Sequence, residues 1–213
     1  MVLDTQRDNI DPILIKIAKV FKDVNPNTLT WLSLLFAVIA GALFYLSSPI
    51  KSSVYLYGAA FFVFLNGLFD AIDGKVAKLA RKVSRRGDFL DHAVDRFADV
   101  FILGGLALSP WCTNRAIGLL AVVGMLLTSY MGTQSQAIGN KRNYSGLLGR
   151  ADRLFILMLF PIVQHIWLVY SGSGLVFRYY ILEWVLVYFA VVGILTAIQR
   201  FYSTLKWFKT ESK

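Results

Sequence analysis

Apolar residues dominate six long stretches of the chain, and short polar segments separate them. Each stretch is about 20 residues or longer, which is the length that a helix needs to cross the hydrocarbon core of a bilayer. The stretches are 28–47, 53–79, 88–108, 115–138, 152–171 and 179–205. The pattern therefore predicts an all-α, polytopic membrane protein with six transmembrane helices.

The first 24 residues have a different pattern, that of an amphipathic helix. One helix face carries apolar side chains, at Ile13, Leu14, Ile17, Val20 and Phe21. Lysines flank that face, which is typical of a helix that lies in the membrane interface; a soluble surface helix is the alternative. We predict an interfacial helix over residues 1–24 and a six-helix transmembrane domain over residues 25–213.

Composition agrees with this class, because 56% of the residues are hydrophobic and only 16% are charged. If the N-terminus is cytoplasmic, only Lys51, Arg115 and Arg178 of the 22 lysines and arginines lie at the outer ends of helices. This asymmetry predicts that both termini are cytoplasmic. The net charge of +9 therefore reflects membrane topology, and we expect no nucleic-acid partner.

Carboxylates interrupt the second and third apolar stretches at helical spacing. Asp70 and Asp73 share one helix face, and so do Asp91 and Asp95. Ionised carboxylates in a membrane are costly unless they are paired, hydrated or bound to metal. Oxygen ligands favour Mg²⁺, Mn²⁺ or Ca²⁺ over zinc, and two aspartates from each helix could hold two ions.

Two residues beside the carboxylates suit a diphosphate. Gly74 allows a ligand to approach the helix backbone closely, and Lys78 adds a positive charge one turn later. A metal site next to a phosphate site at one membrane face suggests displacement at phosphorus.

The spacing resembles the signature of the CDP-alcohol phosphotransferase family, Asp-x2-Asp-Gly-x2-Ala-Arg-x8-Gly-x3-Asp-x3-Asp. The matching positions are Asp70, Asp73, Gly74, Ala77, Gly87, Asp91 and Asp95. The chain departs from the pattern at Lys78, where the family has arginine; lysine keeps the charge but lacks the planar fork. The resemblance also implies a homodimer.

By this resemblance, Asp70, Asp73, Asp91 and Asp95 would bind two Mg²⁺ or Mn²⁺ ions, and Asp95 would also act as general base. A CDP-linked lipid would be the donor and CMP the leaving group. The residues implied to bind the donor are Asn27, Thr28, Leu29, Thr30, Gly74, Lys78 and Ser84. The active site would face the cytoplasm.

Three arginines are candidates for binding the acceptor alcohol. Arg150 and Arg153 share a face at the start of the fifth membrane helix, and Arg200 lies near the end of the sixth. They suit an anionic acceptor, and they resemble the phosphatidylinositol-phosphate synthase branch of the family, so inositol phosphate is the expected acceptor. Glycerol 3-phosphate is the main alternative. A neutral alcohol or serine is a weaker one, and the arginines could also serve only the positive-inside topology.

Neighbouring residues have less specific interpretations. His92 is predicted to point about 100° around the helix from Asp91 and to be structural. Asp88 could support a metal ligand or cap the helix, and Asp99 could bind Arg96 or help the site. Gly104 and Gly105 suggest close helix packing.

A transporter is the alternative from another class, because acidic residues inside a membrane often line ion paths. Transporters commonly contain repeated halves, and no repeat is visible in this chain. The clustering of the acids beside glycine and basic residues favours the enzyme.

Overall fold

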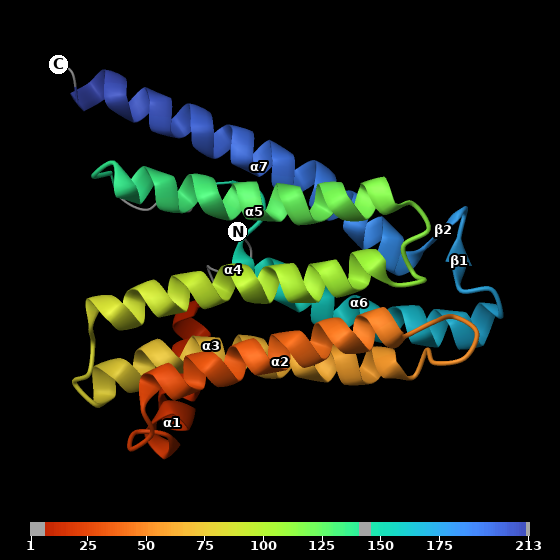
Figure 1. Ribbon diagram of the computed structural model, residues 1–213, viewed down its shortest axis with the longest axis horizontal. Helices are drawn as coiled ribbons and strands as arrows, with labels where there is room; N and C mark the ends of the chain where they lie inside the picture. Colours follow the sequence, from red (N-terminus) through yellow and green to blue (C-terminus); the bar gives the residue numbers. More distant parts are fainter. Residues whose placement is uncertain (1–6, 141–145, 212–213) are drawn as a thin grey trace.

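The computed structural model describes residues 7–140 and 146–211, and helices make up most of this part (Figure 1). The helices are α1 (Arg7–Val20), α2 (Pro26–Leu46), α3 (Tyr55–Leu79), α4 (Arg85–Leu108), α5 (Arg115–Ala137), α6 (Arg150–Ser171) and α7 (Ile181–Glu211). A short antiparallel ribbon joins α6 to α7, formed by β1 (Leu175–Val176) and β2 (Tyr179–Tyr180). The sequence predicted no strand here and placed β2 at the start of the apolar stretch 179–205, because two-residue strands have too few positions to show an alternating pattern.

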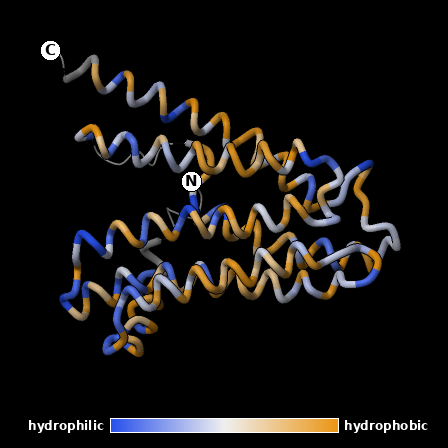
Figure 2. The backbone as a smooth tube through the Cα atoms, in the orientation of Figure 1, coloured by the Kyte–Doolittle hydropathy of each residue, from blue (hydrophilic) through white to orange (hydrophobic). Residues whose placement is uncertain are grey.

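The long helices run side by side, so their connections gather at opposite ends of the molecule (Figure 1). The α2–α3 and α4–α5 connections lie at one end with the β ribbon, and the α3–α4 connection lies at the other. Figure 2 shows that the α3–α4 connection is hydrophilic, whereas the middle parts of the helices are mostly hydrophobic.

Five helices of the described chain are long and apolar enough to cross a membrane. They are α2, α3, α5, α6 and the part of α7 from Ile181 to Phe208. The chain is therefore a multi-pass membrane protein. The remaining long helix, α4, has 24 residues but carries Asp88, Asp91, Asp95, Arg96 and Asp99. Its crossing of the membrane stays a prediction, since these charges break its apolar character.

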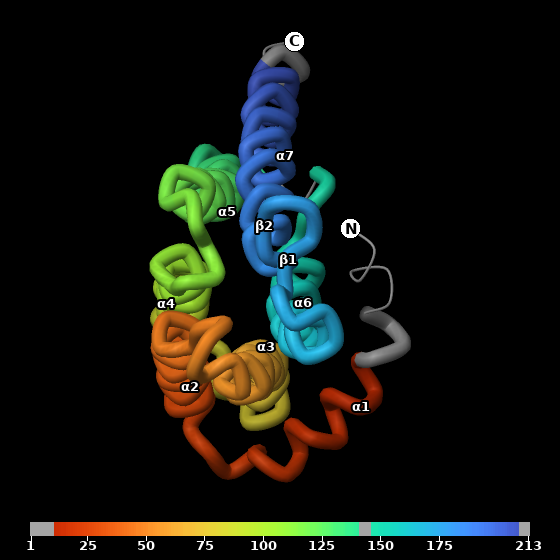
Figure 3. The backbone as a smooth tube through the Cα atoms, turned by 90° about the vertical axis from the view of Figure 1, so that its right-hand side faces the viewer, coloured from red at the N-terminus to blue at the C-terminus, as the bar shows by residue number. Residues whose placement is uncertain are grey.

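Helices α2 to α7 form two groups, which are joined by α6 and by the packing of α4 against α5 (Figure 3). In the first group α2 packs against α3 and α4; in the second, α5 packs against α7. Close approach of α2 and α4 depends on glycine: a Cβ at Gly105 would lie 2.1 Å from the carbonyl oxygen of Gly41. The predicted close packing is thus confirmed at Gly105. At Gly104 a Cβ would meet nothing within 4 Å.

Helix α1 packs beside the C-terminal half of α3 rather than within the bundle (Figure 3). Its inward side belongs to a small apolar cluster that includes Leu14, Ile17, Ala18, Phe21, Leu29, Ile72 and Val76. An ion pair of 2.8 Å between Asp11 Oδ1 and Lys75 Nζ adds to this contact. The apolar face predicted for the helix is divided, because Ile13 and Val20 are 59% and 79% exposed.

Polar contacts fix the end of the molecule opposite the α3–α4 connection. The buried Trp111 donates from Nε1 to Ser47 Oγ over 2.8 Å. Glu183, at the start of α7, is fully buried and accepts a hydrogen bond of 2.8 Å from Thr113 Oγ1. These bonds hold the α4–α5 connection against α2 and α7.

Candidate functional site

The site forms where the C-terminal half of α3 meets the N-terminal half of α4. Residues 80–84 reverse the chain between the helices, with Arg81 in the left-handed region at φ 53°. Ser84 then caps α4, since its Oγ accepts a hydrogen bond of 3.1 Å from the backbone N–H of Gly87. The acidic segments of both helices are thereby placed on either side of one turn.

The two pairs of aspartates converge as their spacing predicted. They are Asp70 and Asp73 on α3, and Asp91 and Asp95 on α4. Asp73 and Asp95 each interact electrostatically with both Asp70 and Asp91. Asp73 and Asp95 are only 5% exposed. Because like charges repel strongly where water is scarce, this cluster requires a compensating cation.

Thr30 of α2 supports Asp73. Its Oγ1 donates a hydrogen bond of 2.6 Å to Asp73 Oδ2, and both residues are buried. The sequence predicted Thr30 only as a donor-lipid contact. The structure gives it a second role, which is to orient one of the clustered carboxylates.

A pocket of about 190 Å³ lies beside the carboxylates Asp73 and Asp91. Its lining includes five of the seven residues predicted to bind the donor lipid, namely Asn27, Thr30, Gly74, Lys78 and Ser84. A Cβ built on Gly74 would meet nothing within 4 Å, so this part of the α3 backbone is open to a ligand.

The other two predicted residues lie elsewhere. Leu29 is 1% exposed and belongs to the apolar cluster under α1, while Thr28 is exposed and outside the described lining of the pocket. Lys82 also lines the pocket, although no pattern in the sequence predicted this. Helix α3 ends at Leu79, so Lys82 lies in the turn before α4, where helix periodicity gives no signal.

Arg150, the first residue of α6, joins the carboxylates of α3 and α4. Its Nη1 contacts Asp70 Oδ2 and lies 2.5 Å from Asp95 Oδ1. The sequence predicted Arg150 as an acceptor contact. Its pairing with two predicted metal ligands could not be read from local spacing, because α6 begins 80 residues after Asp70.

The other two predicted acceptor residues are also buried. Arg153 Nη1 lies 2.8 Å from Asp99 Oδ2, so Asp99 helps the site by pairing with Arg153, while Arg96 Nη1 lies 3.6 Å from Asp95 Oδ2. Arg200 Nη1 donates a hydrogen bond of 2.7 Å to the carbonyl oxygen of Thr128 on α5. The structure therefore brings Arg150 and Arg153 to the acidic face of α4 and holds Arg200 against α5.

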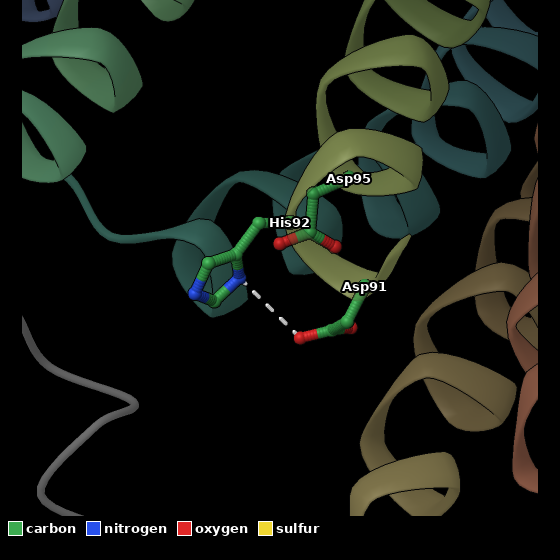
Figure 4. Close-up of side chains that lie close together, drawn as sticks. All are labelled: Asp91, His92 and Asp95. Atoms are coloured by element: carbon green, nitrogen blue, oxygen red, sulfur yellow. Dashed lines mark ion pairs between the residues drawn. The ribbon is translucent and has the colours of Figure 1, made fainter. Parts of the chain in front are cut away.

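His92 lies nearer to the carboxylates than predicted. Its Nδ1 is 3.5 Å from Asp91 Oδ2, and Figure 4 shows the ring turned toward that carboxylate. Asp91, His92 and Asp95 each offer one ligand atom, and these atoms lie within 4.8 Å of one another. The prediction that His92 points away from Asp91 is wrong, because rotation about the side-chain bonds brings the ring back toward its neighbour.

The oxygen atoms of the cluster suit a hard divalent cation. Within the described residues, Asp70 Oδ1 and Asp95 Oδ1 are buried and accept no hydrogen bond, although Arg150 lies close to the second. Buried acceptors of this kind are atoms that a cation would satisfy. Carboxylate oxygens are the ligands that Mg²⁺, Mn²⁺ and Ca²⁺ prefer.

Comparison of the sequence with known proteins agrees with the motif. The model of the family described as CDP-alcohol phosphatidyltransferase matches residues 23–196. Archaetidylinositol phosphate synthase from Pyrococcus horikoshii is 31% identical over 136 residues, which are 64% of this chain and 68% of that protein.

Two crystal structures of Mycobacterium tuberculosis phosphatidylinositol phosphate synthase have a similar fold. The structure with CDP-DAG bound has a TM-score of 0.68 and 24% identity, covering 91% of this chain and 94% of that chain. The structure in complex with manganese and citrate has a TM-score of 0.68 and 23% identity, covering 90% and 88%. These likenesses show that the helices of this chain are arranged as in the M. tuberculosis enzyme.

Proposed function

Since the chain belongs to the CDP-alcohol phosphatidyltransferase family, we propose that it transfers the lipid phosphate of a CDP-linked lipid to inositol phosphate and releases CMP. The chain is a membrane enzyme of phospholipid synthesis that transfers substituted phosphate groups. The observation that carries the proposal is the position of the aspartate cluster, which lies between a pocket with basic residues and two arginines, Arg150 and Arg153.

The pocket next to Asp73 is the proposed site for the CDP group of the donor. Asn27 and Ser84 supply polar side chains, and Gly74 leaves room for close approach to the backbone. Lys78 and Lys82 place two positive charges on the lining, where a diphosphate would be bound. The CDP-DAG bound in the M. tuberculosis enzyme supports the same class of donor here.

The proposed acceptor site lies at the beginning of α6. Arg150 and Arg153 are one turn apart there, and the backbone N–H groups of the first turn add a positive field. An acceptor that carries its own phosphate suits these charges better than a neutral alcohol or serine. The inositol-phosphate product named for the Pyrococcus relative favours inositol phosphate over glycerol 3-phosphate.

Asp70, Asp73, Asp91 and Asp95 are the proposed ligands of two Mg²⁺ or Mn²⁺ ions. When bound, such ions neutralise the phosphate oxygens and the charge that develops on the leaving group. The manganese complex of the M. tuberculosis enzyme supports a divalent ion in this fold. Thr30 holds the Asp73 carboxylate in place through their hydrogen bond of 2.6 Å.

Asp95 is the proposed general base. It accepts the proton of the acceptor hydroxyl while the hydroxyl oxygen forms a bond to the β-phosphorus of the donor. The bond between this phosphorus and the bridging oxygen breaks, and the electron pair leaves with CMP. Lys78 and Lys82 then stabilise the charge on CMP from the side of the pocket.

The membrane arrangement completes the proposal. We assign α4 as a sixth membrane helix, since it is as long as the others and packs between α2 and α5. Helix α1 (Arg7–Val20), within the predicted segment 1–24, would lie in the membrane interface, and residues 25–213 would form the transmembrane domain; residues 1–6 of that segment lie outside the described residues. We place the α3–α4 connection, both termini and the active site at the cytoplasmic face, because the basic residues gather there. A homodimer follows from the resemblance to the family alone.

The test is CMP release by the purified protein in the presence of Mg²⁺, a CDP-linked lipid and one acceptor at a time. We expect CMP release with inositol phosphate and none with inositol or serine. Faster release with glycerol 3-phosphate would replace the assigned acceptor. No release with any of the four acceptors would reject the transferase and favour a transporter.

A further inference from the structure

Arg150 neutralises two of the aspartates that are assigned to the metal. Its Nη1 contacts Asp70 Oδ2 and lies 2.5 Å from Asp95 Oδ1, and the guanidinium also interacts electrostatically with Asp99. The side chain is 20% exposed, and its Nε has no hydrogen-bond partner within the described residues. The carboxylates therefore supply the contacts that hold the guanidinium where it is.

A divalent cation and the guanidinium would share the carboxylates of Asp70 and Asp95. Asp70 Oδ1 is open to a cation, whereas Arg150 holds Asp70 Oδ2 and Asp95 Oδ1. Two positive groups in the same dry space repel each other, so a metal ion on these carboxylates would weaken their hold on Arg150.

We propose that Arg150 is an exchangeable counter-ion that couples binding of the metal to binding of the acceptor's phosphate. Without metal it pairs with Asp70 and Asp95; when metal takes these carboxylates, Arg150 turns to a phosphate at the N-terminus of α6. That helix is 22 residues long, and its first turn starts at Arg150. The Asp152 carboxylate in this turn already accepts a hydrogen bond of 3.1 Å from the Gly149 N–H, so the phosphate would depend on the released guanidinium and on the other N–H groups of the turn. This inference rests on the acceptor site in the proposed function.

Arg153 has a different environment, and this difference makes Arg150 the residue that moves. Its side chain is only 5% exposed, and it pairs with Asp99, which is not among the assigned metal ligands. A metal ion bound by the aspartate cluster therefore does not compete for the carboxylate that Arg153 uses. Arg153 can keep its partner while Arg150 exchanges its own.

Linkage makes the coupling reciprocal. A ligand that draws Arg150 away from Asp70 and Asp95 strengthens metal binding, and metal strengthens the binding of that ligand by the same factor. The arrangement would offset part of the cluster's negative charge before substrates arrive and would favour metal binding once a phosphorylated acceptor is present.

The test measures Mn²⁺ binding to the purified chain in nanodiscs of neutral lipid, by electron paramagnetic resonance of the free ion. No CDP-linked lipid is present, so the result does not depend on activity. Arg150→Gln removes the competing charge. Arg86→Gln is the matched control, because it removes an exposed charge from the first turn of α4. We expect Arg150→Gln to bind Mn²⁺ more tightly than wild type, within the roughly 5- to 150-fold range of coupled sites, and Arg86→Gln to match wild type.

A second arm adds inorganic phosphate at constant ionic strength. Phosphate should tighten Mn²⁺ binding to the wild type and leave Arg150→Gln unchanged. Direct association of Mn²⁺ with phosphate acts on both proteins equally, so their comparison removes it. Equal or weaker Mn²⁺ binding by a folded Arg150→Gln, or an equal phosphate effect on both proteins, would overturn the proposal.

The wild-type arm decides the question even if the variant does not fold, since a wild type without a phosphate effect overturns the coupling. The outcome is also distinct from that of the proposed function. Failure of the proposed function would leave this linkage intact while CMP release with inositol phosphate is absent. Failure of the coupling would leave CMP release intact while the linkage is absent.

Discussion

Asp73 shows how a single carboxylate is held between membrane helices. It is 5% exposed, lies near Asp70 and Asp91, and receives a hydrogen bond from Thr30. Burial, together with the two neighbouring carboxylates, disfavours the charge of Asp73, and the hydrogen bond from Thr30 offsets only part of this effect, so a cation would stabilise the charged form. At the scale of single residues, the site consists of carboxylate oxygens that need positive charge beside them. Arg150 supplies part of that charge.

Thr30→Val should lower the affinity of the site for Mg²⁺ or Mn²⁺ by about 10- to 100-fold, the usual effect of losing a partner that orients a ligand. Valine keeps the shape of threonine but removes the donor to Asp73 Oδ2. Titration of activity against metal concentration measures the change. Thr30→Ser keeps the hydroxyl and should restore most of the affinity; equal loss in both variants would contradict the orienting role.

Lys82→Ala should raise the KM for the CDP-linked lipid by roughly 3- to 10-fold, because a charge on the pocket lining is lost. The KM for the acceptor should not change, since Lys82 lies on the donor side. Lys206, an exposed lysine on α7, provides the control as Lys206→Ala. An unchanged donor KM in Lys82→Ala would show that this lysine does not contact the diphosphate.

Helices place these residues through backbone contacts that the apolar pattern only partly reveals. Gly41 and Gly105 let α2 and α4 approach so closely that Thr30 on α2 and the aspartates on α4 can belong to one site. At the α3–α4 turn, the Ser84 cap sets the direction in which α4 leaves. The geometry of the site thus depends on the capped turn between α3 and α4 and on the close crossing of α2 and α4.

Gly105→Ala should destabilise the protein by about 1–3 kcal/mol, because a methyl group would overlap the Gly41 carbonyl and force the helices apart. Gly104→Ala is the matched control, since its methyl group meets nothing within 4 Å. Thermal unfolding in detergent compares the two variants. A similar unfolding temperature in both would contradict the close packing of α2 on α4.

Local spacing was enough to predict the parts of the site that lie within one helix or one turn. The aspartate pairs, Gly74 and Lys78 follow from residue separations of a few turns, whereas Ser84 was implied only by the family resemblance; the structure brings all of them together. Local spacing does not predict contacts between distant segments, such as the pairing of Arg150 with Asp70. Leu29 was misplaced because a family-like turn does not say which of its side chains face the core.

Other differences have equally physical causes. Six apolar segments were predicted with starts within three residues of α2 to α7, but α7 continues to Glu211 because its polar end remains helical. Lys82 was overlooked because the turn before α4, and not helix periodicity, brings it to the pocket. His92 was misjudged because periodicity gives the direction of a Cβ atom and not the rotation of a side chain.

The site and the contacts that fix the other end of the bundle lie far apart in the molecule. The aspartates and the pocket lie near the α3–α4 connection, whereas the Trp111–Ser47 hydrogen bond and the buried Glu183 lie near the α4–α5 connection. Figure 1 shows these two connections at opposite ends of the molecule. This arrangement suits an enzyme that takes one substrate from the membrane and returns CMP to water at a single face.

Labelling of introduced cysteines with a maleimide that does not cross membranes tests this orientation. Cys112 should not react near pH 7, because burial and the Glu183 carboxylate raise the pKa of its thiol and keep it protonated. In a Cys112→Ser background, Lys51→Cys should be labelled in intact cells, and Arg81→Cys only after the membrane is opened. The reverse result would place the active site at the outer face.

Transfer itself is the most direct test of the central claim that the aspartate cluster carries out phosphoryl transfer to a phosphorylated acceptor. Radiolabelled inositol phosphate is incubated with a CDP-linked lipid, Mg²⁺ and either wild-type protein or Asp95→Asn. The wild type should move label into the lipid fraction in a one-to-one ratio with CMP. Asp95→Asn should fold normally and transfer at least about 100-fold more slowly, as expected when a general base is lost. Full activity in Asp95→Asn, or CMP release without labelled lipid, would contradict the claim.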